Sequence, residues 1–228
     1  MKKLVFLGAA VILAAIFGYN YVAREPITLD RQIKGGIIVL QDKLELSLSD
    51  IKKAASSNPY DYIKNNPAYD SIVNKGPGVL PELREKIANS PQNGLSEYVL
   101  AIAAEEIAKV DLKGSDFGWA NAKEWVSAWD KYLETLPQKV KQISDSTATV
   151  EVKINDLEKL GVPAIPYIMD EVQKGRNELV PALDKLLRDN GLVDYNRDWT
   201  SDVDKWIKDN RAGFDGLRKM VEDVSVGH

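Results

Sequence analysis

One short pattern occurs twice in this chain and limits its fold more than any other feature. It stands first in YDSIVNKGPGVLPEL, residues 69–83, and again about 85 residues later in DLEKLGVPAIPYI, residues 156–168. In each copy a glycine suited to ending one helix is followed by prolines suited to starting the next. The corresponding positions are Ile72, Val73, Gly76, Leu80, Pro81 and Leu83, and then Leu157, Gly161, Ile165, Pro166 and Ile168. The pattern predicts paired helices joined at a tight corner and repeated within one chain.

Two asparagine–proline pairs predict helix starts ahead of the first corner. Asn58-Pro59 and Asn66-Pro67 each place a helix-capping side chain directly before proline, which the first helical position tolerates. At the corner, Gly76 is expected to end a helix in the left-handed conformation, and Pro77 to start the next. Residues 95–110 are the most strongly helical stretch, with an apolar face at helical spacing.

A tryptophan-containing helix follows the paired helices in each half. Trp125 and Trp129 lie four residues apart and share a helix face, and Trp199 is expected to correspond to Trp119. Pro137 is expected to interrupt the first of these helices. The β-branched residues of 147–152 leave a strand as the alternative to a helix at the start of the second copy.

The repeated order predicts an all-α fold, a short α-solenoid of two units. We assign residues 1–23 to a membrane anchor or signal peptide, 24–48 to a stalk or linker, 49–144 to the first helical unit and 145–228 to the second. Each unit ends with its tryptophan helix.

The N-terminus predicts export from the cytoplasm. Lys2 and Lys3 precede an uncharged, mostly apolar run over residues 4–23, and Arg24 follows it. A helix of about 20 residues spans a bilayer core, and the two lysines favour a cytoplasmic N-terminus with the body outside. A signal peptide cleaved after Ala23, giving a secreted protein, is the alternative.

Composition excludes several classes of function. All 34 Asp and Glu residues, but only 28 of the 30 Lys and Arg residues, follow residue 23, so this body carries a formal charge of −6. An acidic body argues against nucleic-acid binding. Cysteine is absent and His228 is the only histidine, which removes thiol chemistry, zinc sites and a Ser-His-Asp triad. No glycine-rich nucleotide-binding motif occurs, and we predict no cofactor.

One stretch has the oxygen-ligand spacing of a calcium loop. The candidate ligands alternate along it and are Asp194, Asn196, Asp198, Thr200 and Asp202. The sixth position, normally glycine, is Trp199, and the twelfth, normally glutamate, is Lys205. A solvated loop in which Thr200 or Ser201 caps the next helix is the preferred interpretation.

At the two corners the chain resembles bacterial proteins built on HEAT-like, armadillo-like helical repeats. Tyr69 and the corner residues above carry the resemblance, together with the tryptophan helices KEWVSAW and DKWIKDN. The second copy departs from the first at Asn155 or Asp156, where Tyr69 would fall. The resemblance covers about residues 49–224 and implies a binding surface rather than a particular reaction.

These observations predict a non-catalytic, membrane-tethered, extracytoplasmic module that binds or scaffolds a protein or peptide partner. The alternatives are an exported cell-envelope hydrolase, or its accessory, that uses a carboxylate pair, and a sensor of peptides or small ligands. The candidate partner-binding residues are the tryptophans, for which core packing is the competing role. They are Trp119, Trp125, Trp129, Trp199 and Trp206.

Overall fold

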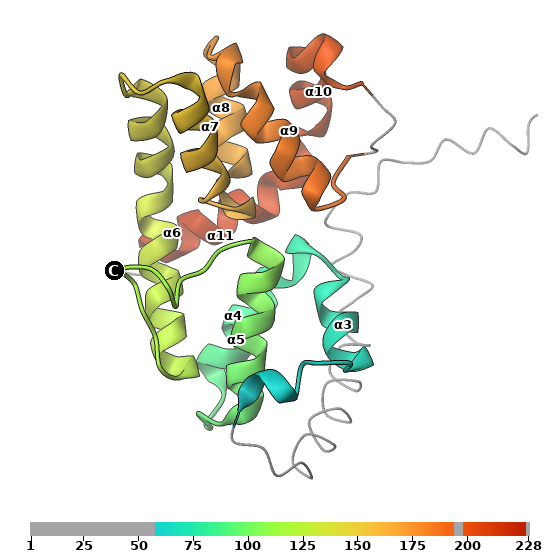
Figure 1. The fold of residues 1–228 in the computed structure, drawn as a ribbon, viewed down its shortest axis with the longest axis vertical. Coiled ribbons are helices and arrows are strands. Elements are labelled where there is room, and N and C mark those ends of the chain that lie inside the picture. The colour runs from blue at the N-terminus through green and yellow to red at the C-terminus, as the bar shows by residue number, and fades with distance from the viewer. Residues whose placement is uncertain (1–57, 194–197, 227–228) are drawn as a thin grey trace, which may run out of the picture.

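Every regular element that the computed structural model describes is helical, which confirms the all-α prediction (Figure 1). The structure describes residues 58–193 and 198–226. The α-helices are α3 (Pro67–Val73), α4 (Leu80–Asn89), α5 (Leu95–Ala108), α6 (Ala122–Asp145), α7 (Val150–Glu158), α8 (Ile165–Gln173), α9 (Val180–Asp189), α10 (Val203–Asn210) and α11 (Asp215–Val226).

The predicted anchor at residues 1–23 and stalk at residues 24–48 lie outside the described residues. Within the described ranges, no helix has the length and apolar character needed to cross a membrane.

The two predicted asparagine caps are confirmed. The side-chain oxygen of Asn58 accepts a hydrogen bond from the backbone N–H of Tyr60 at 3.2 Å, and Pro59 opens a 3₁₀ turn. The side-chain oxygen of Asn66 accepts from the N–H of Ala68 at 3.0 Å, at the start of α3. Each cap satisfies a helix N–H that the helix itself leaves unpaired.

The corner is a 3₁₀ turn that leads directly into an α-helix with proline in its first turn. It occurs at Pro77–Val79 before α4 and at Val162–Ala164 before α8. A third copy, absent from our prediction, occurs at Asn177–Leu179 before α9. Arg176, rather than glycine, precedes that third turn, so the glycine–proline pattern does not predict it.

The two corner glycines adopt nearly the same backbone conformation. Gly76 has φ 71° and ψ −167°, and Gly161 has φ 65° and ψ −167°. This region is open essentially to glycine alone. The predicted left-handed helix end at Gly76 is therefore wrong, because ψ is near 180° and α3 has already ended at Val73.

Helix α6 runs without interruption from Ala122 to Asp145, so the predicted break at Pro137 is wrong. Leu133, Leu136 and Val140, on either side of Pro137, are buried on one face of the helix. Burial of this continuous apolar face outweighs the one backbone hydrogen bond that proline removes.

The strand alternative at the start of the second copy is also wrong. Helix α7 begins at Val150, and Thr149 caps it by accepting a hydrogen bond from the N–H of Val152.

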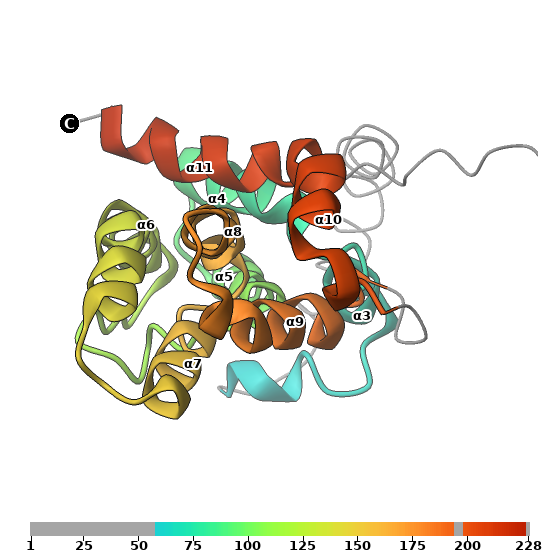
Figure 2. The ribbon, with the colours of Figure 1, turned by 90° about the horizontal axis from the view of Figure 1, so that it is seen from above.

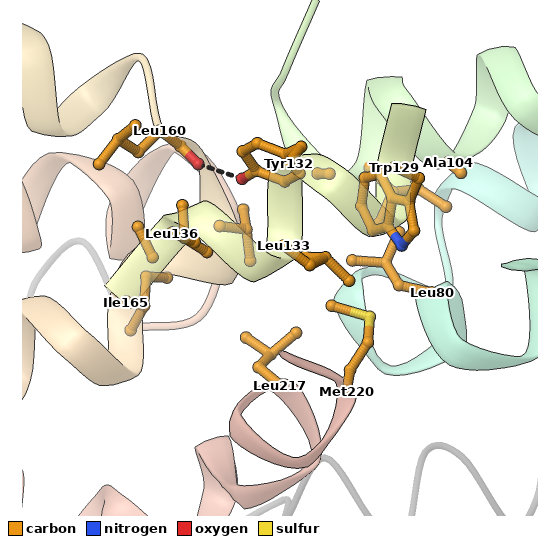
Figure 3. Close-up of a cluster of buried hydrophobic side chains, with 14 of the residues drawn as sticks. Leu80, Ala104, Trp129, Tyr132, Leu133, Leu136, Leu160, Ile165, Leu217 and Met220 are labelled. Carbon is orange, nitrogen blue, oxygen red and sulfur yellow. Dashed lines mark hydrogen bonds between the residues drawn. The ribbon is translucent and has the colours of Figure 1, made fainter. Parts of the chain in front are cut away.

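The packing brings the last helix back onto the first half of the chain. Figure 2 shows α11 lying across one side of the molecule, along α4 and α8, with α7 and α9 on the opposite side. Leu217 and Met220 of α11 pack toward Leu133 of α6 and Leu80 of α4 (Figure 3). Residues from both predicted units therefore belong to one hydrophobic core.

Candidate functional site

A pocket of about 520 Å³ lies where α4, α6 and α11 meet. The first helix contributes Pro81, Arg84, Glu85 and Asn89, the second Trp129, Asp130 and Leu133, and the third Met220, Asp223 and Val224. On each helix these residues are separated by one, three or four positions, which places them on one face. The pocket exists because α11, although last in sequence, packs against α4 and α6.

Arg84 and Asp130 form a two-pronged ion pair across the pocket between α4 and α6. Nε of Arg84 donates to Oδ1 of Asp130 at 3.0 Å, and Nη2 donates to Oδ2 at 2.6 Å. This fork geometry is the strong form of the arginine–carboxylate interaction. The hydrogen bonds to Asp130 raise the pKa of the Arg84 guanidinium, which therefore stays charged.

The charged residues of the pocket are predominantly acidic. Glu85, Asp130 and Asp223 supply three carboxylates, whereas Arg84 supplies the one cation among the lining residues. Both oxygens of Asp130 already accept from Arg84, and Glu85 and Asp223 are exposed. A formal charge of −2 above an apolar floor favours binding of a cation with an apolar part over acid–base chemistry.

The floor of the pocket contains an unsatisfied hydrogen-bond donor. Among the described residues, the buried side-chain nitrogens that lack a hydrogen-bond partner are Nε1 of Trp125 and Nε1 of Trp129. The two indole rings stack with centroids 5.2 Å apart. An unpaired buried N–H costs about 1–3 kcal/mol, and native proteins rarely leave one without a reason.

Four of the five candidate tryptophans lie in the core. Trp125 and Trp129 have no exposed surface, and Trp119 and Trp199 are only 6% and 3% exposed. Trp206 is partly exposed and packs against Trp199 with the two rings tilted, their centroids 4.6 Å apart. Of the five, only Trp129 lines the pocket. Their contact with a partner stays a prediction.

Trp119 and Trp199 make the same kind of hydrogen bond in the two halves of the chain. The indole N–H of Trp119 donates to Glu105 of α5 at 2.6 Å, and that of Trp199 donates to Asp184 of α9 at 2.7 Å. This shared arrangement agrees with the predicted correspondence between the two residues.

Sequence reasoning missed most of the residues that form the pocket. Arg84, Asp130, Met220 and Asp223 were not among the candidate residues, whereas Trp129 was. Opposite charges at Arg84 and Asp130 are 46 positions apart in the sequence, and no local pattern links them. Only the arrangement of the helices brings them together.

The calcium-loop alternative has little support in the described residues. Asp194 and Asn196 lie outside them. Asp198 accepts hydrogen bonds from the backbone and hydroxyl of Thr200, and Asp202 caps α10 by accepting from the N–H of Lys205. The cap is thus Asp202 rather than Thr200 or Ser201. No group of three metal-ligating side chains occurs within the described ranges.

No protein-family model, curated protein or solved structure matches this chain significantly.

Proposed function

We propose that this chain is a non-catalytic, membrane-tethered module that binds a basic segment of a protein partner outside the cytoplasm. The pocket between α4, α6 and α11 is the binding site in this proposal. The observation that carries it is the composition of that pocket, in which an apolar floor of Trp129, Leu133 and Met220 lies below a predominantly acidic wall. An apolar surface supplies affinity, and the charge selects the partner and increases its rate of association.

The pocket volume agrees with this function. About 520 Å³ falls in the range of sites that enclose a small ligand, and it would admit a short stretch of an extended peptide. A lysine or arginine side chain is suited to such a site, because its aliphatic stem packs on apolar surface while its charge faces the carboxylates.

We interpret the three 3₁₀–helix corners before α4, α8 and α9 as the turns of a short HEAT-like solenoid of divergent repeats. Recurrence of the same turn supports this interpretation, as does the Trp119–Glu105 pairing and its copy at Trp199–Asp184. Repeat proteins of this kind mostly present binding surfaces.

The tethered location rests on the sequence of residues 1–23. Its lysines and uncharged run are typical of an anchor that leaves the following chain outside the cytoplasm. Cell fractionation tests this part separately, because recovery of the protein in the soluble cytoplasmic fraction would contradict it.

The binding function is tested by affinity capture from solubilised native membranes with the tagged full-length chain. Wild-type protein is compared with D223K, which places a cation in the pocket. The control is E222K, which makes the same charge change at the adjacent exposed position of α11, outside the lining of the pocket.

The expected result is a partner captured by wild type and E222K but lost from D223K. The captured protein is then purified and titrated, and D223K should weaken its binding by about tenfold or more, which corresponds to the loss of a charge contact. Equal capture by all three proteins, or no capture by wild type, would refute binding in this pocket.

A further inference from the structure

The indole N–H of Trp129 is a buried donor with no acceptor among the described residues. Trp129 has no exposed surface, yet it lines the pocket. In Figure 3 its nitrogen lies on the edge of the ring that faces Leu80 and Met220. Because buried polar groups nearly always have a partner, this donor indicates that an acceptor is supplied when the pocket is occupied.

Trp125 carries the other unpaired donor, but it lies away from the pocket. Its N–H also lacks a partner, and its ring stacks on that of Trp129 at an interplanar angle of 24°. However, Trp125 does not line the pocket. Of the two buried donors, the N–H of Trp129 is therefore the one that a side-chain movement at the pocket could bring within reach of an occupant.

Met220 lies beside Trp129 at the edge of the pocket (Figure 3). It lines the pocket and belongs to the same buried cluster as Trp129 (Figure 3). Methionine has three rotatable side-chain bonds and no branching, so it repacks around different neighbours more easily than other apolar residues. We infer that a change of its rotamer exposes the edge of Trp129 to the pocket.

We propose that the occupant is an extended peptide segment in which a lysine or arginine is flanked by apolar residues. Its backbone carbonyl accepts a hydrogen bond from Nε1 of Trp129, and its basic side chain lies beside Glu85 and Asp223. The charge of the pocket selects a basic over an acidic segment. This inference rests on the proposed binding function and adds the ligand class and its hydrogen-bond donor.

The test is calorimetric titration of the full-length chain with the acetylated, amidated peptide Gly-Leu-Lys-Leu-Gly. The same peptide with glutamate in place of lysine is the control ligand. W129F removes the indole N–H while keeping an aromatic ring in the floor, and W125F makes the same change at the neighbouring unpaired donor. The two variants are therefore matched in chemistry and differ in access to the pocket.

Binding of the lysine peptide, weakened about tenfold by W129F and less than twofold by W125F, would support the inference. The glutamate peptide should bind at least tenfold more weakly than the lysine peptide. If W129F binds the lysine peptide as tightly as wild type, the assignment of the Trp129 donor is overturned and the binding function survives. If wild type binds neither peptide, the basic-segment proposal itself is overturned.

A spectroscopic measurement detects the hydrogen bond directly. The five tryptophans give five indole N–H signals in a proton–nitrogen correlation spectrum, and the two variants assign those of Trp125 and Trp129. The lysine peptide should shift the Trp129 proton downfield. The signals of Trp119 and Trp199, which already donate to Glu105 and Asp184, should stay in place. An unmoved Trp129 signal at saturating peptide would overturn the assignment.

Discussion

Trp119 donates its indole N–H to the carboxylate of Glu105, with 2.6 Å between Nε1 and Oε1. The bond ties the loop after α5 back onto that helix, and the backbone N–H of Leu112 donates to the other oxygen of Glu105 at 3.2 Å. Burial nevertheless raises the pKa of Glu105 above its ordinary value, because the hydrogen bonds offset only part of the desolvation of the charge.

We predict that Glu105 makes the fold less stable as the pH rises above 4.5. With a raised pKa in the folded state, the folded protein binds this proton more tightly than the unfolded chain does. The stability that the protonated Glu105 contributes to the fold is therefore fully present below the ordinary pKa of 4.5. It is lost as the pH rises through the raised pKa of the folded state. E105Q, which cannot ionise, should gain stability relative to wild type between about pH 4 and about pH 7.

Urea denaturation followed by circular dichroism at both pH values measures this difference. Wild type and E105Q are compared at each pH, so that the titration of all other groups cancels. A difference in free energy of unfolding that does not change with pH would show that Glu105 titrates alike in the folded and unfolded states.

The elements that the sequence predicted well are those controlled by local chemistry. Asn66 caps a helix because its own side chain reaches the next free N–H groups, and Gly161 marks a corner because other residues avoid its backbone conformation. The prediction at Pro137 was wrong and the pocket was not predicted, both for one physical reason. The continuity of α6 and the meeting of Arg84 with Asp130 depend on packing between distant segments, which no local pattern encodes.

The two corner glycines predict unequal effects of the same substitution. Both have positive φ, so G76A and G161A each place alanine in a strained backbone conformation. At Gly76 an added Cβ would meet nothing within 4 Å, whereas at Gly161 it would lie 2.3 Å from the carbonyl oxygen of Ala108. We expect G76A to lower the free energy of unfolding by about 1–3 kcal/mol.

G161A should lower the free energy of unfolding further, by about 3–5 kcal/mol. The carbonyl of Ala108 at the end of α5 belongs to the backbone, so it cannot move away from the new Cβ without a shift of the helix. Urea denaturation of both variants measures the difference. G76A thereby serves as the control for backbone strain alone. Equal destabilisation would show that α5 shifts to accommodate the new side chain.

Tyr132 links α6 to the second corner. We predict that removal of its hydroxyl oxygen lowers the stability of the fold. Its hydroxyl is buried and donates to the backbone carbonyl of Leu160 at 2.5 Å (Figure 3). Y132F would leave that carbonyl without its partner, and we expect destabilisation by about 1–3 kcal/mol. Y60F, at a tyrosine that is 49% exposed, is the control and should have almost no effect. A similar result for both variants would contradict the proposed link.

We predict that replacing Pro137 with alanine stabilises the protein. In the middle of α6, P137A restores a backbone N–H in the helix, and proline is about 3 kcal/mol less favourable than alanine at such positions. The greater freedom of the unfolded alanine chain offsets about 1 kcal/mol of this gain. We expect a net rise of about 1–2 kcal/mol in the free energy of unfolding.

The control is P181A in the first turn of α9, where a helix N–H has no intrahelical partner, so we expect only the loss of about 1 kcal/mol that comes from the freer unfolded chain. Thermal and urea denaturation of both variants provide the measurement. A loss of stability in P137A would show that the ring of Pro137 contributes packing that alanine cannot replace.

The Arg84–Asp130 pair predicts opposite effects on folding and on binding. R84M keeps much of the aliphatic bulk of Arg84 but removes the two hydrogen bonds to Asp130. Because the Arg84 side chain is 35% exposed and that of Asp130 only 16%, solvent screens the pair in part, and we expect a loss of about 1 kcal/mol of stability. The same change makes the pocket more acidic, from a formal charge of −2 to −3.

Under the proposed function, the freed carboxylate of Asp130 becomes available to a basic ligand. Titration of R84M with the lysine peptide should therefore show tighter binding than wild type, by about three- to tenfold, and a steeper loss of affinity with added salt. R188M is the control, because it removes the cation that pairs with Asp184 on α9, away from the pocket. Weaker binding by R84M would mean that the ligand requires the arginine itself, and hence an acidic or carbonyl group at that position.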